Sequence, residues 1–101
     1  MAKSSSIEKN KNRAALAKSQ REGRAALKAI IYNKNLPLED RLRATMKLSE
    51  RPRNSSLIRV RNRCEISGRA RSYYRKFHMS RIALRELGNQ GMIPGLTKSS
   101  W

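Results

Sequence analysis

Hydrophobic positions near the start of the chain are sparse and follow a helical spacing. Residues 9–20 are rich in Ala, Lys and Arg, and the preceding Ser5-x-x-Glu8 predicts a capping box at the helix start. The apolar face of this helix is thin, so we expect it to lie along a partner rather than against a core. Gly23 is expected to bend or interrupt it.

A second apolar series predicts a helix hairpin. Leu27 begins an i, i+3, i+4 pattern, residues 33–37 indicate a turn, and a further apolar repeat at every fourth residue ends before Pro52. The expected contact between the two helices comprises Leu27, Ile30, Ile31, Leu38, Leu42, Met46 and Leu48.

The pattern becomes irregular after residue 50. The segment RPRNSS (51–56) is turn-rich and expected to be extended, whereas RVRNRC (59–64) alternates well enough for a short strand. A turn at residues 67–69 is expected to lead this strand back into residues 72–77. The sequence therefore predicts a small β-hairpin here.

A short last helix is predicted after the hairpin. Ser80 is placed to cap it, and Gly88 or Gly91 to terminate it. Pro94 excludes a helix through the segment that follows. Taken together, the patterns predict a mainly α fold with irregular extended regions, in which a helical arm and a helix hairpin precede a small β-hairpin and a short helix.

Composition and charge qualify this predicted fold, because the chain has few apolar residues for a core and a large positive charge. Among its 101 residues, Leu, Ile, Val and Phe number 19, and the net charge is +17. That apolar fraction lies just under the roughly 20% below which a highly charged chain is expected to be disordered alone. Self-repulsion among the cations opposes compaction further. We therefore expect a polyanion to complete the fold.

The two halves carry different cations. Residues 1–50 hold 12 cations led by Lys and 5 acids (net +7), and residues 51–101 hold 12 cations led by Arg and 2 acids (net +10). Guanidinium groups fork onto phosphate, whereas Lys acts as a point charge. We expect a basic helical extension over residues 1–50 and an Arg-rich RNA-binding module over 51–101.

Phosphate binding is the favoured role of the Arg series, because a merely solvated face normally mixes both signs of charge. Aromatic side chains between the arginines suit stacking on unpaired bases, with Tyr73 or Tyr74 favoured for RNA and Phe77 for the core. Trp101 is expected to dock either on RNA or in an apolar crevice. The candidate RNA-binding residues are Arg53, Arg59, Arg61, Asn62, Arg63, Arg69, Arg71, Tyr73, Arg75, Lys76, Arg81, Arg85, Lys98 and Trp101.

Catalysis has little support in the sequence. Cys64 and His78 suggest a nucleophile and a base, but no orienting carboxylate accompanies them and no Gly-rich phosphate loop is present. We expect no enzyme and no cofactor. One cysteine excludes an internal disulfide and favours a reducing compartment, and no apolar run approaches the roughly 18 residues that span a membrane. The Ser-rich start is similar to an organelle presequence, which Glu8 and Glu22 oppose.

Metal-like spacing surrounds the single cysteine. Cys64 and Ser67 have C-x₂-C spacing, and Ser80 and Ala83 repeat it. Structural zinc is almost always bound by four ligands. Only Cys64 offers a thiolate, so we expect these positions to bind no metal.

Several motifs of the second half together resemble small-subunit ribosomal protein S-fourteen. They are RPRNSS (51–56), RVRNRC (59–64), SGR (67–69), YRKF (74–77), SRIALREL (80–87) and IPGLTKSSW (93–101). The resemblance is tight over residues 51–101 and extends to layout over 1–50. It implies a structural constituent of the subunit head that binds the 3′ major domain of small-subunit rRNA, is required for head assembly and supports translation. Implied protein neighbours are S-three, S-ten and S-nineteen.

The same family has a short form with a four-cysteine zinc site and a longer form without these ligands. The present chain resembles the longer, zinc-free form, with a degenerate zinc ribbon whose fold rRNA completes. Packing that metal once fixed is then expected from Ile66, Phe77, Met79 and Ile82. Ala70 departs from the Pro that the family commonly has. The resemblance favours a ribosome in bacterial cytoplasm, with an organelle ribosome as the alternative.

Two other classes of protein fit less well. A free DNA- or RNA-binding regulator needs a self-sufficient core and a recognisable reading element. A cationic membrane-active protein needs a strongly apolar helix face opposite its cations, which the first helix lacks.

Overall fold

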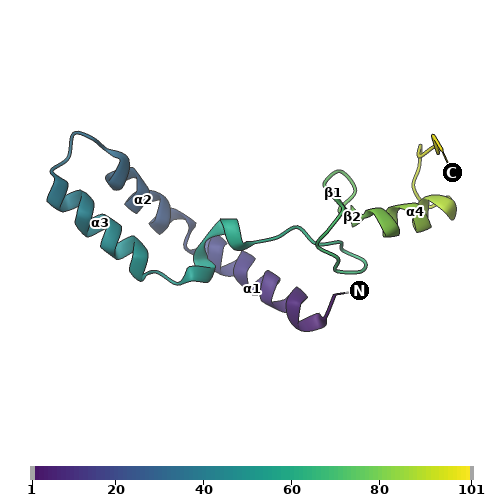
Figure 1. Cartoon of the computed structure of the whole chain (residues 1–101), viewed down its shortest axis with the longest axis horizontal. Coiled ribbons are helices and arrows are strands. Elements are labelled where there is room, and N and C mark those ends of the chain that lie inside the picture. The colour runs from purple at the N-terminus through teal and green to yellow at the C-terminus, as the bar shows by residue number, and fades with distance from the viewer. Residues whose placement is uncertain (1, 101) are drawn as a thin grey trace. The chain divides into compact units, whose positions relative to one another are not determined.

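The computed structural model describes residues 2–100 as a set of helices with one two-stranded sheet (Figure 1). This confirms the predicted mainly α class with a small β-hairpin. The elements are α1 (Ser4–Ser19), α2 (Arg21–Tyr32), α3 (Leu38–Glu50), the 3₁₀ turns η1 (Arg53–Ser55) and η2 (Leu57–Arg59), β1 (Tyr73–Tyr74), β2 (Met79–Ser80) and α4 (Arg81–Asn89).

Two compact units divide the described residues: Lys9–Val60, and residues 2–8 with 61–100. This division follows packing alone, and the functional boundary at residue 50 stays a prediction. No helix within residues 2–100 is both long enough and apolar enough to cross a membrane.

Helix α1 begins earlier than the sequence pattern suggested. The backbone N–H groups of Ser6 and Ile7 already donate to the Lys3 carbonyl at 3.0 and 3.3 Å. Ser5 therefore lies inside the first turn, and the capping box predicted there is wrong. The interruption of the N-terminal helix falls at Gln20, where α1 gives way to α2.

Gly23, where a bend was predicted, lies inside α2 and has a different use. A Cβ atom at this position would lie 2.7 Å from both terminal nitrogens of Arg51. One of these nitrogens, Nη1, donates to Oε1 of Gln20 at 3.0 Å. Because Gly23 has no side chain, the Arg51 guanidinium can lie against α2 and donate a hydrogen bond to Gln20, where α1 ends and α2 begins.

The predicted helix hairpin is confirmed, since α2 and α3 lie side by side (Figure 1). Most of the predicted α3 contact is wrong, however: Leu38, Leu42 and Met46 are 66%, 54% and 65% exposed. Ile30, also predicted in the contact, is exposed.

The buried face of α3 centres on Ala44 instead. Leu48 lies one turn beyond it and is half-buried, as are Leu27 and Ile31 of α2. The small Ala44 side chain allows the close approach of the two helices, and Nε of Arg41 donates to the Ile31 carbonyl at 3.0 Å. Helix α3 therefore turns Ala44 toward α2, and its larger apolar side chains at 38, 42 and 46 remain exposed.

Irregular structure replaces the strand predicted at residues 59–64. The Cys64 N–H donates to the Arg69 carbonyl at 2.9 Å, and the Gly68 N–H donates to the Cys64 carbonyl at 2.9 Å. These bonds close a turn, and residues 59–64 do not pair with a neighbouring strand. Residues 51–56 are turn-rich as predicted, but they are extended at Arg51 and Ser56 rather than throughout, because Arg53–Ser55 form the 3₁₀ turn η1.

The β-hairpin lies further along the chain than predicted. Strands β1 and β2 are antiparallel, with Tyr73 opposite Ser80 and Tyr74 opposite Met79. Their connection is closed by the His78 N–H, which donates to the Tyr74 carbonyl at 2.9 Å. Residues 75–78 therefore form the hairpin loop.

Both predicted ends of the last helix are confirmed. The Ser80 hydroxyl accepts from the Ala83 N–H at 3.3 Å, as an N-cap does. Gly91 has a φ of 73° just beyond the helix, and its N–H and that of Met92 donate to the Gly88 and Leu87 carbonyls at 3.1 and 3.0 Å. This is a Schellman motif. The following segment is not helical through Pro94, as predicted.

Only small side chains are fully buried among residues 2–100. They are Ala17, Ala44, Ser55, Cys64, Ser80 and Ala83. Each removes little apolar area from water, so hydrophobic stabilisation at roughly 25 cal/mol per Å² is modest. The two compact units are therefore weakly stabilised against a large net charge.

We expect the protein without RNA to show helical circular dichroism but no sharp cooperative melt. Amide hydrogens of residues 61–100 should exchange with little protection. This half of the chain has few buried side chains and contains most of the arginines that have no acidic partner. Hydrogen exchange read by mass spectrometry checks this expectation. A sharp melt with strong protection of residues 61–100 would contradict it.

Candidate nucleic-acid interface

The turn after Arg63 surrounds the single cysteine with hydrogen-bond donors. Cys64 is 3% exposed, and the Ser67 N–H lies 3.5 Å from its Sγ. Burial raises the pKa of the thiol, but hydrogen bonds from the Ser67 hydroxyl and from the N–H groups of Ser67, Ser80 and Ile66 outweigh burial and lower the pKa from 9.0 to about 6. The site therefore favours a thiolate at neutral pH.

Three of the four positions with metal-like spacing lie together, because Ser67 and Ser80 both hydrogen-bond to the Cys64 sulfur, but their donors do not suit zinc. Ser80 Oγ already accepts from the Ala83 N–H, and Ser67 Oγ accepts from the Arg69 N–H at 3.5 Å. Ala83 supplies no donor atom. Across residues 2–100, no three or more His, Cys, Asp or Glu residues are grouped as a metal site requires.

Arg63 braces the same turn. Its Nη1 donates to the Gly68 carbonyl at 3.0 Å, and its buried Nε has no hydrogen-bond partner among the described residues. Gly68 is itself constrained, because its φ is 75° and a Cβ there would lie 2.6 Å from Cδ1 of Ile7. Arg63, a candidate RNA contact, thus also holds the turn together.

Exposed cations surround the turn, the hairpin and α4. Within residues 2–100, the guanidinium groups of Arg71, Arg75, Arg81 and Arg85 form neither an ion pair nor a hydrogen bond inside the chain. Arg61 and Lys76 are also exposed, and Arg69 is half-buried. The hairpin and helix thus present several guanidinium forks to a polyanion.

Arginines of the other unit are used differently. Arg24 donates to the Ser55 hydroxyl at 3.0 Å, and Arg43 lies 3.7 Å from a carboxylate oxygen of Asp40. Arg59, a candidate RNA contact, donates to the side-chain oxygen of Asn54 at 3.1 Å. Arg53, the other candidate of this unit, is exposed. Most arginines of Lys9–Val60 therefore have a polar or ionic partner inside that unit, although the exposed Arg43–Asp40 pair contributes little to stability.

The aromatic side chains of the hairpin differ in whether they already have a partner inside the protein. The Tyr73 hydroxyl lies 2.7 Å from Nδ1 of His78, and the Phe77 ring is half-buried with Nζ of Lys76 at 5.7 Å from its centroid. Tyr74 is 50% exposed. The sequence prediction gave Tyr73 or Tyr74 as the RNA contact and listed Tyr73 among the candidates, and the alternation of β1 is the signal that separates the two.

Two of the side chains expected to pack around the hairpin do not do so. Ile66 and Ile82 are exposed, because the turn and the first turn of α4 face them toward solvent. Trp101 lies outside the described residues.

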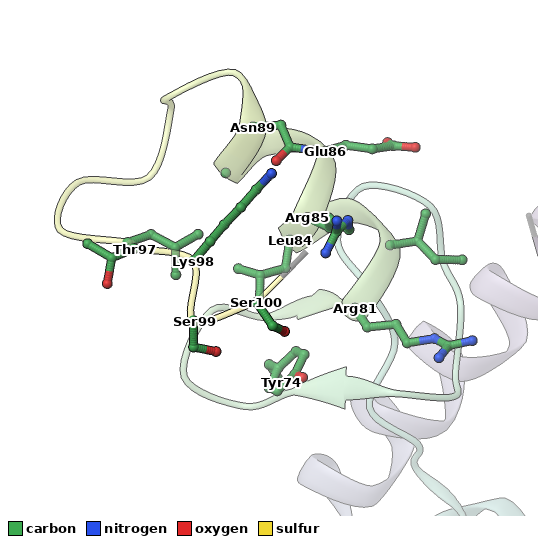
Figure 2. A pocket seen from close by; sticks show the side chains of 13 residues that line it. Tyr74, Arg81, Leu84, Arg85, Glu86, Asn89, Thr97, Lys98, Ser99 and Ser100 are labelled. Atoms are coloured by element: carbon green, nitrogen blue, oxygen red, sulfur yellow. The ribbon is translucent and has the colours of Figure 1, made fainter.

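A cavity of about 750 Å³ opens between α4 and the tail segment, residues 91–100 (Figure 2). Leu96 closes one part of it, since a Cβ at Gly88 would lie 2.6 Å from its Cδ2. The lining also includes Tyr74, Arg85 and Lys98. No pattern in the sequence indicated this cavity, which depends on the tail folding back over Gly88.

Arg71, Arg75, Arg81 and Arg85 have no side-chain partner within residues 2–100, a pattern typical of structural proteins with a basic surface for polyanions. Residues 47–100 match the family described as Ribosomal protein S14p/S29e. The chain is 62% identical to the small ribosomal subunit protein uS14 of Brucella anthropi and to that of Xanthobacter autotrophicus, and 60% identical to that of Azorhizobium caulinodans. Each match covers 100% of both chains.

The chain therefore belongs to the ribosomal protein S14p/S29e family, as its motifs indicated. It is a structural constituent of the small ribosomal subunit and not an enzyme.

The Cys64 thiol in the folded protein should titrate with a midpoint near pH 6. Because its folded pKa lies below the unfolded value, the stability it contributes is full above about pH 9 and is gone once the pH falls through about 6. The ¹³Cβ chemical shift of labelled cysteine in the RNA-bound protein measures this midpoint. A midpoint between pH 8 and 9 would show that the hydrogen bonds to sulfur are absent.

Proposed function

We propose that the chain binds small-subunit rRNA through its Arg-rich half and is required for assembly of the subunit head. The observation that carries this proposal is the set of guanidinium groups on the hairpin and α4 that have no partner within residues 2–100. Each can donate two parallel hydrogen bonds to a phosphate. Their neutralisation by RNA would also remove the self-repulsion that opposes packing of residues 61–100.

The hairpin loop and α4 are well suited to contacting adjacent phosphates. Arg75 and Lys76 occupy the loop, whereas Arg81 and Arg85 are four residues apart and share one face of α4. The Schellman motif and the Ser80 cap fix the length of this helix. The proposed target is the 3′ major domain of the small-subunit rRNA, in a bacterial cytoplasmic ribosome.

Protein neighbours are proposed for the helix hairpin. Leu38, Leu42 and Met46 form an exposed apolar stripe along α3, and exposed apolar surface of this kind commonly marks protein contacts. The proposed neighbours are ribosomal proteins S-three, S-ten and S-nineteen. This assignment supports the division into a helical extension over residues 1–50 and an RNA-binding module over 51–101.

The region from Cys64 to Ala83 is proposed to be a degenerate zinc ribbon that rRNA completes. The support is local: a turn at residues 64–69 and the start of α4 still converge on one sulfur atom, held by backbone N–H groups instead of a metal. The frame has thus been kept while three donor positions hold Ser, Ser and Ala.

Replacing Arg71, Arg75 and Arg81 by Ala one at a time should weaken binding to a transcript of the 3′ major domain by about 1 kcal/mol each. The slope of log K against log salt should become shallower by roughly 0.7–0.9 for each phosphate that the variant no longer neutralises. Filter binding over a salt series measures both quantities. The triple variant should fail to enter reconstituted subunits.

Arg43→Ala is the matched control, because it removes the same charge from an exposed position on α3. It should leave the salt slope unchanged. Equal losses of affinity for Arg43→Ala and Arg75→Ala would indicate general charge attraction, and normal incorporation of the triple variant would contradict the proposed interface.

Restoring thiols at the three substituted positions should create a zinc site. The combined Ser67→Cys, Ser80→Cys and Ala83→Cys variant places four thiolates around the frame, and structural zinc binding of this kind contributes roughly 10–16 kcal/mol. Elemental analysis should find about one zinc per variant chain and none in the parent or in its Cys64→Ser variant. Zinc in the parent chain, removable by chelator with loss of structure, would contradict the zinc-free assignment.

A further inference from the structure

The cavity between α4 and the tail segment combines an aromatic face, an apolar wall and cations. In Figure 2, the Tyr74 ring lies below Ser99 and Ser100 of the tail, with Leu84 and Arg85 on the side of the helix. Leu96 over Gly88 supplies further apolar lining. Arg81 and Lys98 complete the cationic part of the lining.

The dimensions and chemistry of this cavity suit a nucleotide. Its volume of about 750 Å³ falls within the roughly 300–1,000 Å³ of small-molecule sites. A base presents two flat apolar faces and polar edges, and its phosphate carries a negative charge. Tyr74 and Leu84 match the faces, the Ser99 and Ser100 hydroxyls match the edges, and Arg85 matches the phosphate.

Tyr74 is the aromatic residue that is free to stack. Its neighbour Tyr73 is held by the hydrogen bond with His78, and Phe77 is half-buried beside Lys76. Tyr74 is half-exposed and faces the cavity. Arg85 has no partner inside the described part of the chain, so its guanidinium is available to an anion.

We propose that this cavity takes one unpaired nucleotide of the small-subunit rRNA, with its base stacked on Tyr74 and its phosphate bound by Arg85. The proposal rests on the proposed function and names a single-nucleotide subsite within it. Proteins that read RNA commonly splay bases out of loops and stack them on aromatic side chains. A cavity with cations at its rim and a tyrosine inside fits that mode better than it fits an apolar side chain from a protein neighbour.

The test is binding of the full-length protein to a transcript of the 3′ major domain, compared among three tyrosine variants. Tyr74→Phe keeps the ring and should bind like the parent. Tyr74→Leu keeps apolar bulk on the strand but lacks the ring, and should weaken binding roughly 5- to 150-fold, the range typical for loss of one stacked base. Tyr32→Leu, at a position on α2 that is 77% exposed, is the control and should bind like the parent.

Salt dependence separates stacking from charge in the same experiment. Tyr74→Leu should leave the slope of log K against log salt unchanged, because stacking releases no counterions. Arg85→Gln should make the slope shallower by roughly 0.7, as expected for one phosphate of a single strand. Chemical probing of the transcript should show one unpaired nucleotide whose protection disappears in both Tyr74→Leu and Arg85→Gln.

Failure of the subsite is distinguishable from failure of the proposed function. A parent protein that does not bind the transcript overturns the proposed function. A parent that binds, with Tyr74→Leu no weaker than Tyr32→Leu, overturns the subsite alone. The subsite is also overturned if Tyr74→Leu binds the transcript normally but fails to enter subunits in the presence of the other proteins, since the cavity then holds a protein side chain.

Discussion

The balance between a core of small side chains and a charge of +17 governs the rest of this structure. Alanine, serine and cysteine can be packed closely, but they remove too little apolar surface from water to offset repulsion among so many cations. Backbone geometry supplies much of the remaining order, through the Ser80 cap, the closed turn at Cys64 and the Schellman motif at Gly91. These local bonds do not neutralise the excess positive charge.

Arginine has different roles in the two compact units. In Lys9–Val60, arginines form hydrogen bonds within the protein. Arg41 donates to the Ile31 carbonyl, and Arg51 donates to the Gln20 side chain at a place where Gly23 leaves room for the guanidinium. In residues 61–100, most guanidinium groups face solvent unpaired, whereas Arg63 braces a turn. A count of charges alone therefore does not distinguish the arginines that bond inside Lys9–Val60 from those of residues 61–100 that have no internal partner.

Sequence reasoning predicted features set by local chemistry and failed where tertiary packing decided. The Ser80 cap, the glycine termination of α4 and the turn before Leu38 depend on a few adjacent residues, and all were predicted. The rotation of α3 was missed, because an alanine at position 44 allows a closer approach than leucine or methionine would. The strand at residues 59–64 was wrong because alternation cannot show where a backbone partner lies. The interface residues were chosen from type and position, but neither shows that Tyr73 is tied to His78 while Tyr74 faces a cavity.

The single buried cysteine has a practical consequence. Its sulfur is nearly a thiolate at neutral pH, yet the surrounding turn shields it from reagents. Alkylation must then wait for this turn to open, and opening also breaks the hydrogen bonds that stabilise the thiolate, so the modification rate follows the population of the opened turn. The labelling rate of Cys64 accordingly reports local opening of this turn, and comparing the rate in the free protein with the rate in the assembled small subunit would measure how far assembly suppresses that opening.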